Sequence, residues 1–283
     1  MTAADDFVLR RRVAEEAARA AGEVHLRYFG QKLGRDVHGG NRADYTTVAD
    51  LEAQAAVKQT IARYWPDDVV VGEEDMELGG RIAELLEGAC WLTDPLDGTQ
   101  EFSHGNPGFS CVVGYVKEGE PLVGAAYFAV WDEMFSAAAG MGATLNGAPI
   151  RVSVVTKLEQ ALFAVPQSNV STPERQQRFV ERVERLLPRV EGFRMPGARS
   201  LMACGVAAGR YDITSTFDLR RELSPDRPFS GQPWETVAFV VLVHEAGGAV
   251  VSLDGGPPDL LGYNTYAASR ELIEAYLSVA GDV

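Results

Sequence analysis

Apolar residues recur at helical spacing in the first part of the chain. In residues 7–29 they return every three or four positions, which predicts a long amphipathic helix that ends at Gly30. A second helix is expected to begin at residue 46 or 47 and to run to residue 64. It should end there because Pro66 follows and cannot continue a helix. Residues 34–41 are rich in glycine and are expected to form a loop.

Short apolar runs bounded by turn residues come next, which is the pattern of buried strands. One run covers residues 69–71 and another covers residues 90–93, and a short helix is expected between them at residues 81–87. The pair Asn146-Gly147 is a hairpin signal. An antiparallel meander is expected in three segments rich in β-branched and aromatic residues, namely 109–116, 122–130 and 133–138.

The second part of the chain mixes strands and helices. A strand is expected in residues 161–166, followed by an amphipathic helix in residues 173–187 whose mixed charges indicate a solvated face. An alanine-rich helix then ends at Gly209. We place an N-terminal α+β half at residues 1–153 and a C-terminal α/β half at residues 154–283. No flexible linker joins them, so the halves are expected to form one compact unit.

The strand at residues 90–93 runs into two carboxylates, Asp94 and Asp97, that flank a Pro-Leu pair. Because proline fixes its own φ and restricts the residue before it, the turn is expected to aim both side chains at one point. Two carboxylates held that close repel each other unless a cation lies between them, and oxygen ligands suit Mg²⁺, Ca²⁺ or Mn²⁺. The backbone carbonyl of Leu96 lies between the two acids and is a further candidate ligand.

Gly98 and Thr99 follow directly. The glycine lets backbone N–H groups approach an anion closely, and the threonine hydroxyl can hold a water molecule. The combined interpretation is a metal-assisted phosphoryl site, and the alternative is an Asp-rich turn that caps a helix starting near Gly98. Two more acidic groups add candidate carboxylate ligands and so favour the metal site. Residues 73–75 follow the expected strand at residues 69–71, and Glu235 opens a strongly apolar run.

Several motifs in this order resemble those of the inositol monophosphatase superfamily of Mg²⁺-dependent, Li⁺-sensitive phosphatases. They are Gly-Glu-Glu at residues 72–74, Trp-x-x-Asp-Pro-Leu-Asp-Gly-Thr-x-x-Phe at residues 91–102, and a tryptophan and acid at residues 234–235 before a helix that ends Glu-Ala-Gly-Gly at residues 245–248. The fit extends from about residue 7 to the last helix. The resemblance implies an α+β protein with the layered α-β-α-β-α sandwich of the inositol monophosphatase-like (sugar phosphatase) fold, and a homodimer.

The resemblance also implies roles for single residues. Two or three Mg²⁺ ions are expected, with Li⁺ as an inhibitor, and the implied metal ligands are Glu73, Asp94, the Leu96 carbonyl, Asp97 and Glu235. One ion lowers the pKa of a bound water that Glu73 and Thr99 position and deprotonate, and another stabilises the leaving alkoxide. Asp50 ends the pattern Asp44-x-x-Thr47-x-x-Asp50 and is expected to orient the threonine. The implied substrate contacts are Asp97, Gly98, Thr99, Gly197, Ala198, Arg199 and Glu235.

The chain departs from the superfamily pattern at four places. Glu235 stands where aspartate is usual, and the added methylene matters because Mg²⁺ demands near-ideal octahedral geometry. Arg199 stands where small residues are common, so it either contacts a second anionic group of the substrate or forms a structural ion pair. Many members of the superfamily carry a lysine shortly before the segment 44–50, whereas the corresponding residue of this chain lies near Gly39. The segment 215–233 is longer than expected and is a candidate lid or oligomer contact, in which Arg220, Arg221 and Arg227 either bind a substrate anion or are solvated.

Charge and composition narrow the partners. The 283 residues carry a formal net charge of −14, which argues against nucleic acid because its phosphates would be repelled. A phosphate substrate would then need metal ions to enter. No run of about 18 apolar residues and no signal-type N-terminus occurs, so we expect a cytoplasmic protein without a membrane partner. The three scattered cysteines suggest neither disulfides nor a zinc site.

The sequence leaves the substrate open. The expected activity is hydrolysis of a small polyol, sugar or nucleotide phosphate monoester. Residues 94–102 look like the branch that acts on 3′(2′),5′-bisphosphate nucleotides, whereas residues 104–107 look like the inositol branch, and histidinol phosphate is a further alternative. A different class of function is a catalytically weak member that serves as a binding or regulatory dimer, for which Glu235 and the long segment are the indications.

Overall fold

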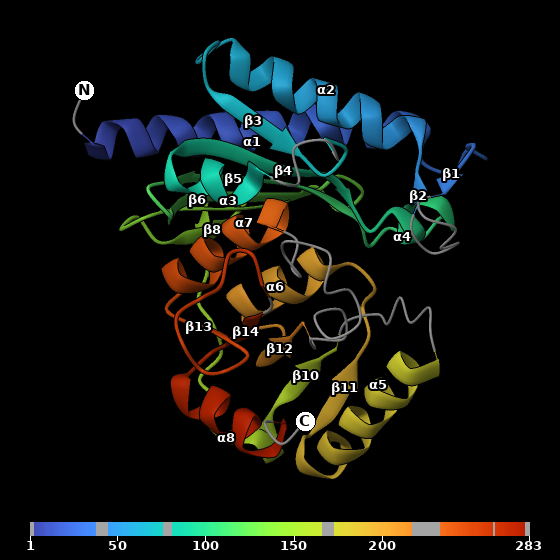
Figure 1. Ribbon diagram of the computed structural model, residues 1–283, viewed down its shortest axis with the longest axis vertical. Coiled ribbons are helices and arrows are strands. Elements are labelled where there is room, and N and C mark those ends of the chain that lie inside the picture. Colours follow the sequence, from blue (N-terminus) through green and yellow to red (C-terminus); the bar gives the residue numbers. More distant parts are fainter. Residues whose placement is uncertain are drawn as a thin grey trace.

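The structure is built as alternating layers of helices and sheets (Figure 1). It is a computed structural model that describes residues 3–37, 45–75, 81–165, 173–216, 233–262 and 264–280. Two long helices cover a seven-stranded sheet, two more lie between this sheet and a five-stranded one, and the last two cover the outer face of the second sheet. The expected layered α-β-α-β-α sandwich is therefore confirmed.

The outer layer of the first sheet consists of α1 (Ala3–Tyr28) and α2 (Val48–Ala62). The amphipathic pattern of α1 is confirmed, but the helix begins before residue 7. Leu26, an apolar residue near the end of the helix, lies outside the buried stripe and is 53% exposed. Small residues let α1 lie close to the sheet, and the buried stripe comprises Val13, Ala14, Ala17, Ala18, Ala21 and Val24.

The seven-stranded sheet has its strands in chain order, β3 to β9. The first two strands are parallel, joined by the crossover helix α3 (Ile82–Glu87), and the remaining neighbours pair antiparallel. The expected meander and the hairpin at Asn146-Gly147 are confirmed, and both turn residues have positive φ. The strands are β3 (Val69–Gly72), β4 (Ala89–Asp97), β5 (Ser110–Lys117), β6 (Glu120–Phe128), β7 (Glu133–Ala138), β8 (Ala143–Leu145) and β9 (Ala148–Pro149).

The second sheet is mixed, with the strand order β11-β10-β12-β14-β13. Strand β10 is parallel to both of its neighbours, and β14 is antiparallel to both of its own. Apart from β10, its strands were not foreseen, because each spans only three or four residues. They are β10 (Leu162–Ala164), β11 (Gly192–Arg194), β12 (Ile213–Ser215), β13 (Ala249–Ser252) and β14 (Asn264–Ala267).

Helices α5 (Pro173–Leu186) and α8 (Arg270–Ala280) cover the outer face of this sheet, and a 3₁₀ turn, Leu187–Arg189, extends α5. A two-stranded ladder joins β1 (Asp36–Val37) to β2 (Tyr45–Thr46). The two sheets come from residues 69–149 and 162–267, and the division of the chain near residue 153 stays a prediction.

The central layer holds α6 (Arg199–Ala207) and α7 (Pro233–Glu245). Helix α7 is apolar on all sides, which is the pattern of a helix buried on both faces. It packs against the glycine pair of the first sheet, Gly114 and Gly124, which are direct cross-strand partners. A Cβ at Gly124 would lie 2.5 Å from the carbonyl oxygen of Ala238, so only glycine admits the α7 backbone at this distance.

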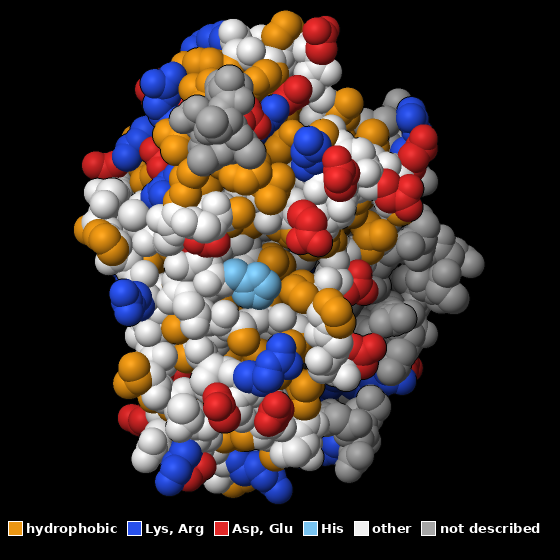
Figure 2. All heavy atoms as spheres, turned by 90° about the vertical axis from the view of Figure 1, so that its left-hand side faces the viewer, with side chains coloured by type: hydrophobic (Ala, Val, Ile, Leu, Met, Phe, Trp, Pro, Cys, Tyr) orange, Lys and Arg blue, Asp and Glu red, His pale blue; other side chains and the backbone are white. Residues whose placement is uncertain are grey.

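Several expectations fall on residues outside the described ranges. They concern Gly39, most of segment 215–233 with Arg220, Arg221 and Arg227, and Asp44. Within the described ranges no helix combines the length and apolarity needed to cross a membrane. On the face shown in Figure 2, basic and acidic side chains are interspersed.

Replacing Gly124 by alanine should destabilise the protein by about 1–3 kcal/mol, the usual cost of overpacking a filled interior. The added methyl group meets the α7 backbone, which cannot rotate away as a side chain can. Urea unfolding monitored by circular dichroism measures the change. Gly34→Ala is the control, because no atom lies within 4 Å of a Cβ at that position. Equal stability of the two variants would contradict the close docking of α7.

Candidate metal centre

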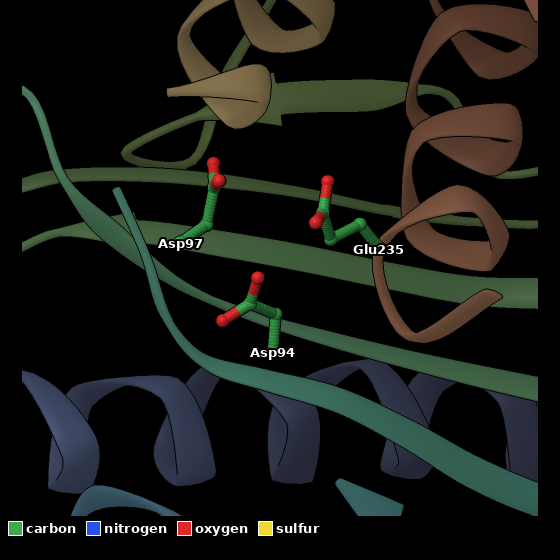
Figure 3. Close-up of side chains that lie close together, drawn as sticks. All are labelled: Asp94, Asp97 and Glu235. Carbon is green, nitrogen blue, oxygen red and sulfur yellow. The ribbon is translucent and has the colours of Figure 1, made fainter. Parts of the chain in front are cut away.

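The site begins at an irregularity in β4. This strand pairs regularly with β5 up to Asp94, after which the register shifts before Asp97 pairs with Ser110. Pro95 lies in the shifted segment, where it has no N–H to leave unpaired. The irregularity turns both acids to the same side of the strand, as expected from the sequence (Figure 3). Gly98 follows with φ of +94° and precedes the short helix α4 (Thr99–Ser103).

Three carboxylates meet at this point. Asp94, Asp97 and Glu235 each offer an oxygen, and the three oxygens lie within 4.8 Å of one another. Figure 3 shows the two aspartates rising from β4 toward the carboxylate of Glu235, which extends from the first turn of α7. All three residues are buried. The structure thus brings together acids that are 138 positions apart in the chain, from Asp97 to Glu235.

Each acid of this cluster has a defined neighbour. Asp94 Oδ1 accepts a hydrogen bond from the Leu96 N–H at 2.9 Å. Asp97 Oδ2 accepts one from the Ser200 N–H at 2.6 Å, and the Arg199 N–H approaches Oδ1 at 3.4 Å. These two donors belong to the first turn of α6, where the helix dipole favours a negative charge. The Arg199 side chain donates from Nη2 to Glu235 Oε1 at 2.7 Å.

Glu73 lies at the end of β3, beside the cluster. Its N–H donates to the Thr93 carbonyl at 3.0 Å, and its carboxyl is within hydrogen-bonding reach of Asp94. The loop that carries it is fixed by Asp75, which accepts hydrogen bonds from the Gly72 N–H at 2.7 Å and from Lys58 Nζ at 2.7 and 2.8 Å. Glu73 therefore lies where it could bind the same metal ion as Asp94, although it is outside the group of three acids whose oxygens lie within 4.8 Å of one another.

Asp50 connects the start of α2 to the motif threonine. Its Oδ2 accepts from both the N–H and the hydroxyl of Thr47, at 2.8 and 2.6 Å, which completes a capping box. Its Oδ1 accepts from the Thr99 hydroxyl at 3.1 Å, and the same hydroxyl lies 3.1 Å from the Leu96 carbonyl oxygen. Because this hydroxyl directs its single hydrogen toward these acceptors, its lone pairs face away from them. Asp50 thus lies where it was expected to orient Thr99, and its role stays a prediction.

The predicted substrate residues surround the same space. Gly98 and Gly197 both have positive φ, and a Cβ at Gly98 would lie 3.0 Å from the Cβ of Ala198. A Cβ at Gly197 would lie 2.5 Å from the carboxylate of Glu101, so both glycines are required by space and by backbone conformation. Arg199 does form an ion pair, with Glu235. This was one of the two alternatives left open by the sequence.

Burial and mutual repulsion shape the electrostatics of the acids. Burial, followed by the nearby carboxylates of Glu235 and Glu74, raises the pKa of Glu73 to about 8. The pKa of Asp94 is raised well above its usual range by burial and by Glu73, Glu235 and Asp97. Burial raises the pKa of Glu235 to about 7 although the Arg199 charge opposes the shift. Without a counterion these acids resist sharing three negative charges.

The donor set fits a divalent cation with a preference for oxygen ligands. Glu235 Oε2 is buried and accepts no hydrogen bond from an N–H or hydroxyl group, and the Glu235 carboxyl lies within hydrogen-bonding reach of Asp94. With both acids ionised, this arrangement costs free energy unless a cation or a water molecule satisfies the oxygen. Asp94 and Asp97 present further carboxylate oxygens to the same space. A cluster of oxygen donors alone suits Mg²⁺, Ca²⁺ or Mn²⁺ rather than zinc. The Leu96 carbonyl, a predicted ligand, accepts from Thr99 in this structure.

Sequence reasoning missed one neighbour of the site. His25, on α1, is fully buried, and its Nε2 lies 2.8 Å from the carbonyl oxygen of Pro95, between the two motif aspartates. A carbonyl only accepts, so Nε2 carries the proton. Burial lowers the pKa of His25 to about 4, and the ring stays neutral at physiological pH. Its position four residues after Ala21 placed it on the buried stripe of α1, which was the available signal.

Without divalent cations, the free energy of unfolding should fall as the pH rises from about 4.5 to 8. The pKa values of Glu73, about 8, and Glu235, about 7, exceed the ordinary value of 4.5, so the folded protein binds more protons in this window. Raising the pH removes protons that favour the folded state. Urea unfolding in EDTA at several pH values measures this slope. Asp94→Asn should flatten it, and an equal slope in both proteins would contradict the shared cluster.

Comparison with known proteins agrees with this geometry. The sequence profile of the Inositol monophosphatase family matches residues 9–282. The chain is 34% identical to Inositol monophosphatase 2 of Solanum lycopersicum over 95% of this chain and 97% of that one. It is 32% identical to the Fructose-1,6-bisphosphatase/inositol-1-monophosphatase of Aquifex aeolicus, with 87% and 86% covered. The solved structure of the Thermotoga maritima IMPase superposes with a TM-score of 0.79 at 26% identity, covering 96% of this chain and 97% of that one. The chain belongs to the inositol monophosphatase family, whose members are phosphoric monoester hydrolases.

Proposed function

We propose that this protein hydrolyses the phosphate monoester of a small polyol or sugar with the help of Mg²⁺. The observation that carries the proposal is the meeting of Asp94, Asp97 and Glu235 in one buried space, where an oxygen of Glu235 accepts no hydrogen bond from an N–H or hydroxyl group. Family membership and the names of the relatives, which include inositol and fructose bisphosphate phosphatases, favour this substrate class. Nucleotide bisphosphates and histidinol phosphate remain alternatives for the test.

Asp94, Asp97 and Glu235 would hold the metal, with Glu73 and the Leu96 carbonyl beside them. When bound, Mg²⁺ supplies Lewis acidity that activates a water molecule and stabilises the leaving oxygen. Glu73 is the candidate base, because its carboxyl lies beside the acidic cluster, and a cation bound there would favour its ionised form, which can accept a proton from water. Glu73 and Asp94 lie within hydrogen-bonding reach of each other, so a proton on the Glu73 carboxyl has a defined acceptor.

Thr99 is the candidate for positioning water. Its single hydrogen is shared between Asp50 Oδ1 and the Leu96 carbonyl oxygen, each 3.1 Å away, which leaves its lone pairs to accept a hydrogen bond from a water molecule. The positive φ of Gly98 exposes the N–H groups at this turn, and we assign them to the phosphate. Gly197, Ala198 and Arg199 border the same space and are the proposed contacts for the rest of the substrate.

The direct test is phosphate release by the purified protein from a panel of inositol, sugar, nucleotide and histidinol phosphates. We expect turnover of an inositol or sugar phosphate with Mg²⁺, none with EDTA, and inhibition by Li⁺. Gel filtration with light scattering would test the proposed homodimer, and fractionation of source cells would test the proposed cytoplasmic location. Binding of Mg²⁺ without turnover of any member of the panel would favour a regulatory role.

Asp94→Asn should keep the fold and reduce Mg²⁺-dependent turnover by more than the roughly 10- to 100-fold cost of losing an outer-shell partner of a metal. The substitution removes one of the three converging carboxylates and preserves the shape of the side chain. Steady-state phosphate release measures the effect, and circular dichroism checks the fold. Asp67→Asn, at an exposed acid outside the cluster, is the matched control. Near wild-type turnover of Asp94→Asn would exclude the proposed site.

A further inference from the structure

We propose that Arg199 competes with the divalent cation for the carboxylate of Glu235, so that the metal centre of this protein carries its own regulator of metal affinity. The inference rests on one part of the proposed function, namely that the acidic cluster binds a metal ion. It concerns Arg199, which the proposed function uses only as a substrate contact, and gives this residue a separate effect on the metal. Arg199 acts here through Glu235, as a positioning residue.

The first step is the geometry of the pair. Arg199 Nη2 lies 2.7 Å from Glu235 Oε1, and the other oxygen of the same carboxylate, Oε2, is buried and accepts no hydrogen bond from an N–H or hydroxyl group. A guanidinium hydrogen-bonded to one oxygen places a fixed positive charge beside the lone pairs that a cation needs. Like charges at such short range repel strongly in a buried space. Arg199 and the cation are therefore in competition for one ligand.

The second step is that the pair can open without disturbing the other acids. The Glu235 side chain is 3% exposed, whereas that of Arg199 is 19% exposed, so the arginine lies on the open side of the pair. Asp97 is held by backbone N–H groups of residues 199 and 200, which do not depend on the Arg199 side chain. Movement of the guanidinium toward solvent would leave α6 and the two aspartates in place.

The third step is the consequence for the two states of the site. Without metal, Arg199 lowers the repulsion within a cluster of three buried carboxylates by pairing with Glu235. When a cation occupies the cluster, Glu235 becomes its ligand and Arg199 is displaced toward the exposed side. The metal affinity then depends on how much more strongly Glu235 interacts with the cation than with Arg199, and not on the carboxylates alone.

The test is the binding of Mn²⁺, followed by the electron paramagnetic resonance signal of the free ion at pH 8. Arg199→Ala should bind Mn²⁺ about tenfold more tightly than the wild type, a change of about 1.4 kcal/mol. Arg199→Lys keeps the charge on a single donor group and should lie between the two. Arg63→Ala is the matched control, because it removes one positive charge from an exposed pair with Glu16 and should leave the affinity nearly unchanged.

An affinity that is equal or weaker in Arg199→Ala would overturn the inference and would show that the arginine holds Glu235 in place for the metal. Arginine side-chain NMR of the wild type gives a second measurement if the variants fold poorly. Saturating Mg²⁺ should shift the Arg199 Nε–Hε signal, assigned in the wild type by through-bond correlation to the backbone of this residue, and an unchanged signal would also overturn the inference. Phosphate release by the wild type is independent of both readouts, so failure of the proposed activity is distinguishable from failure of the competition.

Discussion

The fold of this protein holds three buried carboxylates together against their mutual repulsion. Asp94, Asp97 and Glu235 are buried and place oxygens within 4.8 Å of one another. Such an arrangement is unfavourable by itself, and the fold must hold it against the tendency of the acids to separate. Burial, followed by the neighbouring carboxylates, raises the pKa of Asp94 well above its usual range, and burial raises the pKa of Glu235 to about 7.

Separate devices hold the acids together. The irregularity in β4 turns the two aspartates to one side, and the first turn of α6 receives Asp97 on its backbone N–H groups. Glu235 is brought in by α7, whose close approach depends on Gly114 and Gly124 in the sheet below. The core thus has a functional consequence, because the depth at which α7 docks decides whether Glu235 reaches the aspartates. This link joins glycines in β5 and β6 to the chemistry at the end of β4.

The sequence predicted those parts of the site that are contiguous. Asp94 and Asp97 are separated by a proline whose restricted backbone made their convergence foreseeable. Asp50 was reached only through the resemblance, although its capping box with Thr47 is a local pattern. Glu235 was reached through the resemblance, because no local rule connects it to residues 138 positions away. The strands were foreseen where apolar runs are long, as in the meander, and missed where they are short, as in the five-stranded sheet.

For two residues, His25 and Arg199, the partner could not be predicted from the sequence, and the physical reason is the same. The bond from His25 to the Pro95 carbonyl and the pair of Arg199 with Glu235 both depend on how layers stack, and the periodicity of one element contains no information about its neighbour. A buried histidine and a lone arginine are each compatible with many partners. The structure selects one for each, and in both cases the partner lies in or beside the acidic cluster.

The most direct test of the account is a crystal structure of the protein soaked with Mn²⁺, with the ion located by its anomalous scattering. The account predicts an anomalous peak among the carboxylate oxygens of Asp94, Asp97 and Glu235. Absence of a peak there under conditions in which Mn²⁺ binds in solution, or a peak coordinated by other residues, would contradict the central claim.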